Sequence, residues 1–222
     1  MKLCICLSQD WKEQWLDSLN KADLLELRID LMFRDEATET EVVEALTPLL
    51  IENSHKIILT CRVGKISQEV RYNLFLALLP FAPAYIDLEH DTPQHFREPL
   101  HTAAQKYGVK IITSFHHHDA TPDRADLCTM AKKALLGGAG LVKIVAHCRD
   151  TYDEAKLLSL YREECLTGKI VAFGMGHYGL TSRLHAAASG APLLYVAADC
   201  GAATAQGQPR FTQFTEHLLN VC

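Results

Sequence analysis

Short runs of strand-forming residues recur along the whole 222-residue chain, and helical patterns fill the intervals between them. The runs, which are rich in Val, Ile, Leu, Tyr and Phe, lie at 3–7, 24–29, 56–61, 84–88, 109–113, 141–146, 169–173 and 193–197. Strict alternation of strands and helices implies parallel strands joined by right-handed crossovers. Eight repeats favour a closed barrel over an open doubly wound sheet. We therefore expect an α/β protein, a (β/α)8 TIM barrel that forms a single domain over residues 1–222.

Local signals support the helices between these runs. Thr38 is followed three residues later by Glu41, the spacing of a capping box, and apolar residues then recur on one helical face. Thr121-Pro122 predicts another helix start, with Thr121 as the N-cap and Pro122 at the first helical position. No Gly-x-Gly-x-x-Gly sequence leads from a strand into a helix, which disfavours a dinucleotide-binding domain.

Composition excludes several classes of function. The formal net charge is −5 and no basic stripe with interleaved aromatics occurs, so we expect no nucleic-acid partner. The longest uncharged apolar run, residues 74–86, contains two prolines and is shorter than the roughly 20 residues of a membrane span. The first apolar run is too short for a signal peptide, and the eight cysteines contain no Cys-x-x-Cys pair. These features indicate a cytoplasmic protein with free thiols and no membrane partner.

Lys143 lies in the middle of the apolar run at 141–146, which follows Gly140. A lysine is rarely buried without a partner, because removing an ammonium group from water costs several kcal/mol at least. Loss of the proton relieves that cost, and a neutral amine can attack a carbonyl carbon to form a Schiff base. The alternative is a lysine near a strand end whose amine reaches solvent.

Other polar residues follow the ends of the predicted strands, where the active site of a (β/α)8 barrel forms. They are Glu26, Arg28, Arg62, Asp87, Glu89, Ser114 and His116, with Arg183 in the loop after the seventh strand. Glu26 and Arg28 could instead form a structural ion pair at the barrel rim. His116-His117-His118 could be solvated, or could bind a metal, but adjacent histidines on a strand point in alternate directions and do not easily share one ion.

The order of these motifs along the chain resembles that of type I 3-dehydroquinate dehydratases. The resemblance covers essentially the whole chain and rests on an ordered set of short motifs. They are Glu26-Leu27-Arg28-Ile29-Asp30, Thr60-Cys61-Arg62, Ile86-Asp87-Leu88-Glu89, Ser114-x-His116 with Thr121-Pro122, Val142-Lys143-Ile144, Met175-Gly176-x-x-Gly179-x-x-Ser182-Arg183 and Gln206-Gly207-Gln208. Each motif alone is weak evidence, but their order is specific.

The resemblance implies a Schiff-base-forming lyase of the class I aldolase type that acts on 3-dehydroquinate in the shikimate pathway of aromatic amino-acid biosynthesis. By position, Lys143 forms the imine with the C3 ketone and His116 moves protons. The substrate carboxylate is assigned to Arg183, Thr204 and Gln208, and the ring hydroxyls are assigned to Glu26, Arg28 and Arg62. The family needs no cofactor and no metal, and its members are usually homodimers.

Three positions depart from the family pattern. Ile66 stands where the family has the glutamate that supports the histidine, Cys6 replaces a serine of the first strand, and Thr204 replaces the serine of the last loop. A different carboxylate must therefore orient His116 if any does. We expect Glu89, at the end of the fourth strand, to take that role, and Glu69 to lie in a lid over the barrel mouth.

Three alternative functions remain open from the sequence. The first is another Schiff-base enzyme of the aldolase or transaldolase type, although no clear phosphate-binding glycine loop follows the seventh or eighth strand. The second is a catalytically impaired homologue that binds a ring carboxylate without turnover. The third is a metal-dependent hydrolase that uses the histidine cluster.

Overall fold

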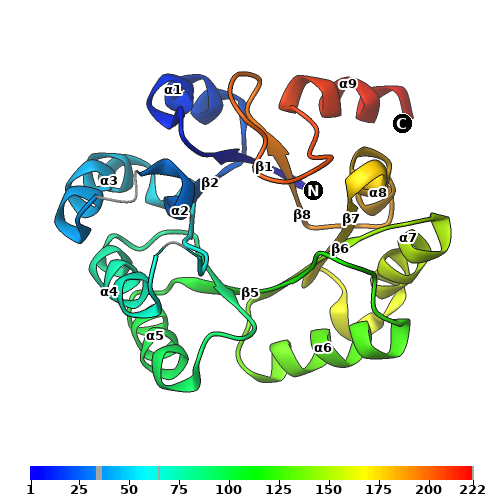
Figure 1. The fold of residues 1–222 in the computed structure, drawn as a ribbon, viewed down its shortest axis with the longest axis horizontal. Coiled ribbons are helices and arrows are strands. Elements are labelled where there is room, and N and C mark those ends of the chain that lie inside the picture. The colour runs from blue at the N-terminus through cyan, green and yellow to red at the C-terminus, as the bar shows by residue number, and fades with distance from the viewer. Residues whose placement is uncertain (34–36, 65, 222) are drawn as a thin grey trace.

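Eight parallel strands form one sheet that curves into a nearly closed barrel (Figure 1). The computed structural model describes residues 1–33, 37–64 and 66–221. The strands are β1 (Lys2–Leu7), β2 (Leu24–Arg28), β3 (Ile57–Thr60), β4 (Tyr85–Glu89), β5 (Lys110–His117), β6 (Leu141–His147), β7 (Ile170–Met175) and β8 (Leu193–Ala197). Their hydrogen-bonded order is β7-β6-β5-β4-β3-β2-β1-β8, so β7 and β8 are the two ends of the ladder.

Helices surround this sheet and connect its strands, as Figure 1 shows from one end of the barrel. They are α1 (Trp11–Lys21), α2 (Ile29–Met32), α3 (Glu39–Asn53), α4 (Gln68–Leu78), α5 (Gln94–Lys106), α6 (Arg124–Leu136), α7 (Thr151–Leu158), α8 (Gly179–Ala188) and α9 (Phe211–Val221). The predicted (β/α)8 barrel is confirmed, and each predicted strand has its counterpart.

The element boundaries confirm one local prediction and correct two others. Thr38 and Glu41 form the predicted capping box at the start of α3. The fifth strand is longer than predicted and continues to His117, so His116 projects from a strand and not from a loop. Helix α6 begins at Arg124 with Asp123 as its N-cap. The Thr121 hydroxyl, expected to cap that helix, instead donates a hydrogen bond to the His147 carbonyl, 2.9 Å away.

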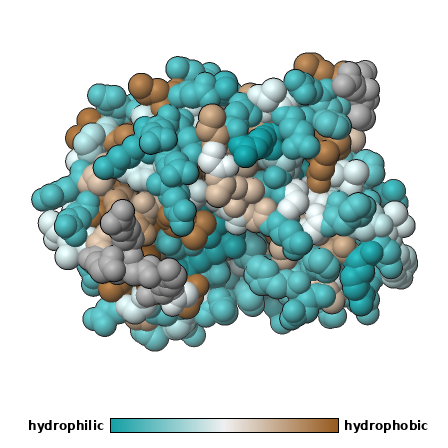
Figure 2. All heavy atoms as spheres, turned by 45° about the horizontal axis from the view of Figure 1, so that its top comes forward, coloured by the Kyte–Doolittle hydropathy of each residue, from teal (hydrophilic) through white to brown (hydrophobic). Residues whose placement is uncertain are grey.

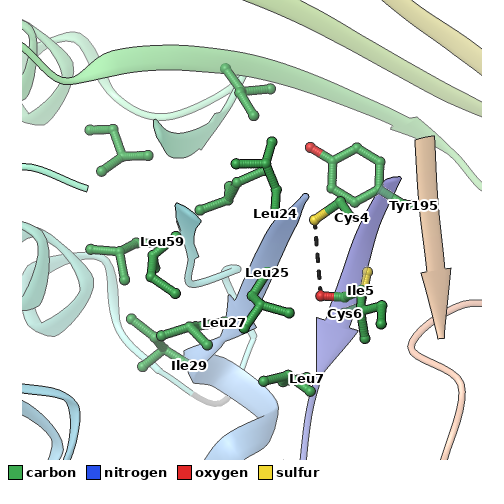
Figure 3. Close-up of a cluster of buried hydrophobic side chains, with 14 of the residues drawn as sticks. Cys4, Ile5, Cys6, Leu7, Leu24, Leu25, Leu27, Ile29, Leu59 and Tyr195 are labelled. Atoms are coloured by element: carbon green, nitrogen blue, oxygen red, sulfur yellow. Dashed lines mark hydrogen bonds between the residues drawn. The ribbon is translucent and has the colours of Figure 1, made fainter. Parts of the chain in front are cut away.

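The barrel wall is apolar on its helix-facing side, and alternate residues of each strand turn inward. Figure 3 shows this packing where β1 and β2 meet, with Leu25 and Leu27 among the buried side chains. Tyr195 of β8 lies beside Cys4 of β1, its register partner in the ladder. Burial raises the pKa of the Cys4 and Cys6 thiols, so both stay protonated and behave as apolar residues.

Two adjacent residues of α8 fill the gap between β7 and β8. The Ser182 hydroxyl accepts a hydrogen bond from the Gly174 N–H at 2.9 Å and donates one to the Gly174 carbonyl at 3.2 Å. Arg183 Nε donates to the Tyr195 carbonyl of β8 at 3.0 Å. Side chains of α8 therefore satisfy backbone groups that a neighbouring strand would satisfy elsewhere in the barrel.

The outer surface is mainly hydrophilic, with apolar residues scattered among polar ones on the face shown in Figure 2. Large exposed apolar side chains occur on separate elements, among them Leu16, Ile51, Leu136 and Tyr152. Scattered residues of this kind are normal on a globular surface. Within the described part of the chain, no helix combines the length and the apolar character that a membrane crossing requires.

Candidate active site

A pocket of about 400 Å³ opens at the C-terminal ends of the strands. Almost every strand contributes to it, which is why residues far apart in the sequence meet there. The lining includes Cys6, Glu26, Arg28, Arg62, His116, His118, Lys143, Val145, His147, Phe173, Met175, Arg183, Tyr195, Thr204, Ala205, Gln206 and Gln208. All predicted catalytic and substrate-binding residues therefore share one cavity, whereas Glu69 and Glu89 are not among its lining residues.

Lys143 lies at the base of this pocket, and its side chain is 4% exposed. Its Nζ donates hydrogen bonds to two carboxylates, Glu26 Oε1 at 3.1 Å and Asp87 Oδ2 at 3.2 Å. Hydroxyl groups hold both acceptors in place. Thr60 donates to Glu26 at 2.9 Å and Ser114 donates to Asp87 at 2.5 Å. The amine points into the barrel and does not reach bulk solvent, so the solvent-reaching alternative is wrong.

The charge state expected for Lys143 is also wrong. Burial lowers the pKa of the amine, as anticipated, but the charges of Glu26 and Asp87 outweigh burial and raise it above 10.5. Burial also opposes ionisation of Glu26, yet Lys143, Arg28 and Arg62 together lower its pKa from 4.5 to about 2. The resting site therefore contains an ammonium ion between two buried carboxylates. Glu26 pairs with Lys143, and not with Arg28 as the structural alternative required.

His116 projects into the pocket from β5 and meets a cation. Its Nε2 lies 2.7 Å from Arg62 Nη2, so the imidazole accepts a hydrogen bond from the guanidinium. Burial lowers the pKa of His116 well below its ordinary value of 6.5, and the charges of Arg62 and Lys143 lower it further. The imidazole is consequently neutral at pH 7 and can accept a proton.

Glu89, expected to orient His116, and Glu69, expected in a lid over the barrel mouth, are not among the residues that line the pocket. Glu89 Oε2 accepts hydrogen bonds from the Val63 N–H at 3.0 Å and from Arg71 Nη2 at 3.3 Å. These contacts attach the loop after β3 to the end of β4. Glu69 is exposed in the first turn of α4. The structure shows no hydrogen bond between Glu89 and His116 among the described residues, so the orienting role of Glu89 stays a prediction.

Arg183 is the largest fully buried side chain of the described chain, at 1% exposure. Its Nη1 donates to the Gly179 carbonyl at 2.6 Å, Nε bonds to the Tyr195 carbonyl, and Cζ lies 4.2 Å from the centre of the Phe173 ring. All these contacts are neutral. Burial lowers the pKa of the guanidinium to about 10, which is the direction expected for a cation without a carboxylate partner. An anion entering the pocket would supply the missing charge.

The loop after β8 brings the last predicted residues to the pocket. Gln208 Oε1 accepts hydrogen bonds from the Thr204 N–H at 2.8 Å and the Thr204 hydroxyl at 3.0 Å, and Gln208 Nε2 donates to Cys6 Sγ at 3.2 Å. The loop packs backbone against backbone on the residues after β7. A Cβ on Gly207 would clash with the Gly176 carbonyl oxygen, so only glycine allows this approach.

The pattern of Glu26, Arg62, His116, Lys143 and Arg183 around one cavity agrees with a comparison of the whole sequence. A model of the family described as type I 3-dehydroquinase matches residues 3–220. The chain belongs to this family. The predicted resemblance and the prediction of an enzyme of this family are both confirmed.

Relatives of this type I 3-dehydroquinase family member cover most of its length. The chain is 28% identical over 193 residues to the 3-dehydroquinate dehydratase of Pyrococcus abyssi, with 84% of this chain and 83% of that protein covered. It is 34% identical over 190 residues to the 3-dehydroquinate dehydratase of Pyrobaculum aerophilum, covering 83% of this chain and 58% of that protein.

Solved structures show the same fold. The 3-dehydroquinate dehydratase of Aquifex aeolicus matches at a TM-score of 0.83 with 25% identity, covering 100% of this chain and 99% of that chain. The enzyme of the same name from Geobacillus kaustophilus matches at a TM-score of 0.86 with 19% identity, covering 99% and 90%.

Sequence reasoning placed Asp87 at a strand end without giving it a role, and it did not single out Tyr195 and His147, which line the pocket of this family member. Asp87, two residues before Glu89 on β4, is the second carboxylate on Lys143. Tyr195 seemed part of an apolar strand, and His147 lies at the end of β6. Inward alternation along the strands could have identified His147, which follows Lys143 and Val145 at period two. Among the described residues, no group of three or more His, Cys, Asp or Glu side chains is arranged to bind a metal ion.

Proposed function

We propose that this chain is a 3-dehydroquinate dehydratase that converts 3-dehydroquinate into 3-dehydroshikimate and water through an imine on Lys143. The observation that supports this most is the placement of a buried amine, a neutral imidazole and a buried guanidinium without a carboxylate partner around one pocket. Relatives across most of the chain carry the name 3-dehydroquinate dehydratase.

The amine makes the difficult proton removal possible. Attack of Lys143 on the C3 ketone releases water and leaves a protonated imine, which accepts electrons better than the ketone does. The neighbouring C–H becomes more acidic, an enamine forms, and loss of the hydroxyl as water gives the conjugated imine. Hydrolysis of that imine by another water molecule then releases the product and restores the amine of Lys143. Glu26 and Asp87, at 3.1 and 3.2 Å from Nζ, stabilise positive charge on this nitrogen. The same negative charges also disfavour deprotonation of Lys143, although only the neutral amine can attack the ketone.

His116 supplies the proton transfers in this proposal. A low pKa keeps the imidazole neutral, with its lone pair on the Nε2 atom that accepts from Arg62. When the substrate displaces Arg62 from this atom, Nε2 takes the substrate proton, and the imidazolium then protonates the leaving hydroxyl. Arg62, which donates to Nε2 at 2.7 Å, takes the position at the histidine that a carboxylate would otherwise occupy. The positive charge of Arg62 lowers the pKa of His116. The imidazole is therefore a weaker base, but a larger fraction of it is neutral at pH 7.

The remaining polar residues bind the substrate. Arg183 has no carboxylate partner and suits the substrate carboxylate, with Thr204 and Gln208 of the last loop beside it. We assign the ring hydroxyls to Glu26, Arg28 and Arg62, which line the same pocket. Arg28 is held by Asp30 through bonds of 3.0 and 2.6 Å, so its position is fixed before the substrate arrives. Only protein side chains take part in these steps.

The cellular setting remains part of the proposal. We propose that residues 1–222 act as one domain in a cytoplasmic homodimer of the shikimate pathway. Scattered exposed apolar residues do not by themselves identify a dimer surface.

The decisive experiment combines turnover with trapping. Purified protein should convert 3-dehydroquinate into a product with the ultraviolet absorption of a conjugated enone. Borohydride added with substrate should inactivate it irreversibly, and peptide mass mapping should place the adduct on Lys143; borohydride without substrate is the control. Turnover without an adduct, or an adduct on another lysine, would contradict the mechanism. Tight substrate binding with neither turnover nor trapping would identify the impaired homologue.

A further inference from the structure

Tyr195 has no assigned role, yet it lies against the reactive nitrogen. The residue is 2% exposed on β8, and the Lys143 Nζ lies 3.8 Å from the centre of its ring. The ring stands beside Cys4, on the inner side of the junction between β1 and β8 (Figure 3). Its hydroxyl is buried and has no hydrogen-bond partner among the described residues. The contact with Lys143 therefore comes from the ring face and not from the hydroxyl.

An aromatic face attracts a cation, and the attraction strengthens when both groups are removed from water. Both conditions hold here, since Lys143 and Tyr195 are almost completely buried. Glu26 and Asp87 contact the same nitrogen, so carboxylates and a ring face surround one positive charge. A protonated imine places its charge on this nitrogen too. The ring can therefore stabilise the charge before and after the covalent bond forms.

We propose that Tyr195 is a further catalytic residue, whose ring face stabilises the positive charge on the Lys143 nitrogen, first as ammonium and then as protonated imine. The second half of this statement rests on the proposed dehydratase function. Bond formation consumes the amine and the ketone and releases one water, and the ring exchanges no proton or electron in any step. Burial raises the pKa of the phenol well above 10, so the hydroxyl stays protonated and does not act as a base.

Other groups also set the charge on Lys143. Glu26 and Asp87 favour the ammonium form, while Arg62 opposes it. His116, Cys4 and Cys6 lie close enough to interact with the amine but are neutral at pH 7. A test must change the ring and leave all these groups in place.

Substitution within the ring meets that requirement. Tyr195→Phe removes only the hydroxyl, and Tyr195→pentafluorophenylalanine keeps the shape while removing the negative potential of the ring face. A small amine-directed reagent, methyl acetimidate, is applied at pH 8, and mass spectrometry follows modification of Lys143. This measures the neutral fraction of the amine without any need for turnover. The steady-state kcat and KM for enone formation are measured in parallel.

We expect modification to be about threefold to thirtyfold faster in the pentafluorinated protein than in the Tyr195→Phe protein, the range expected for a buried cation–π contact. The kcat should fall over the same range with a smaller change in KM. Equal modification rates in the two proteins would overturn the proposal. So would a change in Tyr195→Phe as large as that in the fluorinated protein, which would assign the effect to the hydroxyl.

Two further measurements keep the test interpretable. If the fluorinated protein does not fold by circular dichroism, Tyr195→Leu replaces it in the same comparison. If wild-type protein forms no enone, the dehydratase function fails, but the modification rates still decide whether the ring stabilises the ammonium.

Discussion

Two buried cations lie in one barrel mouth, and their surroundings differ in a single respect. Lys143 and Arg183 both lie over an aromatic ring, at 3.8 Å from Tyr195 and 4.2 Å from Phe173. Lys143 also contacts two carboxylates, whereas the hydrogen bonds of Arg183 within the described chain all go to backbone carbonyls. Their pKa values accordingly shift in opposite directions, upward for Lys143 and down to about 10 for Arg183.

The comparison separates a cation that the protein neutralises from one that it leaves for a ligand. A buried ion pair compensates much of the cost of removing its charges from water, but a cation with neutral partners keeps that cost. An anion bound at Arg183 would offset this desolvation cost. The same pocket can therefore contain a charged group used in covalent chemistry and a charged group used in recognition.

The largest expected difference between the two sites is in the loss of stability when each cation is replaced by methionine. Lys143→Met leaves Glu26 and Asp87 buried without a counter-charge, so we expect the free energy of unfolding at pH 7 to fall by about 3–5 kcal/mol. Arg183→Met removes a charge that has no carboxylate partner, and its loss should stay within about 1 kcal/mol because the lost hydrogen bonds offset the relief of desolvation. Urea unfolding measures both. Similar losses in the two variants would show that the carboxylates do not distinguish the sites.

The pH dependence sharpens this contrast. In wild-type protein the folded pKa of Glu26 is depressed to about 2, so its contribution to stability is present above pH 4.5 and is lost as the pH falls through 2. Lys143→Met lacks the cation that contributes most to lowering this pKa, so Glu26 can take up a proton at higher pH. The stability gap between wild type and Lys143→Met should therefore narrow between pH 4.5 and 2, while the gap for Arg183→Met should not.

Substrate affinity should depend on Arg183. Loss of a buried charge-assisted contact costs about 2–5 kcal/mol, so Arg183→Ala should raise KM by roughly thirtyfold or more. Any decrease in kcat would reflect poorer positioning, since the carboxylate is remote from the bonds that change. The KM of Arg183→Lys should lie between those of wild type and Arg183→Ala, because lysine keeps the positive charge but lacks the planar guanidinium. Steady-state kinetics with 3-dehydroquinate decides, and an unchanged KM would contradict the carboxylate role.

The sequence predicts that Lys143 and Arg183 belong to the pocket, but it does not predict which residues surround Lys143. Strand and helix periodicity, with the order of motifs, predicted the barrel and the pocket residues, including Lys143 and Arg183. The sequence could not show which of the two inward-facing carboxylates of β4 reaches Lys143. That choice between Asp87 and Glu89 depends on the stagger of neighbouring strands, which the chain sets through the tilt of the whole barrel.

The charge state of Lys143 was predicted wrongly for the same reason. Burial could be predicted from an apolar run within one strand, but the carboxylates that oppose its effect come from residues 26 and 87. Tyr195 shows the limit in another form. Leu-Leu-Tyr-Val-Ala has the pattern of a core strand, and nothing local indicates that its tyrosine faces a lysine of β6, near the other end of the hydrogen-bonded ladder.

The smallest expected effect concerns the backbone contacts that position Arg183. Ser182 satisfies both the N–H and the carbonyl of Gly174 at the free edge of β7, and its neighbour Arg183 bonds to β8. Ser182→Ala leaves buried backbone groups unpaired, so we expect a stability loss of about 1–3 kcal/mol. It should also raise KM more than it lowers kcat, because α8 is then free to shift Arg183 relative to the substrate carboxylate.

Thr181→Ala is the matched control, because it removes an exposed hydroxyl one residue away. A loss of stability with unchanged KM would show that Ser182 stabilises the barrel between β7 and β8 but does not position Arg183 for substrate binding.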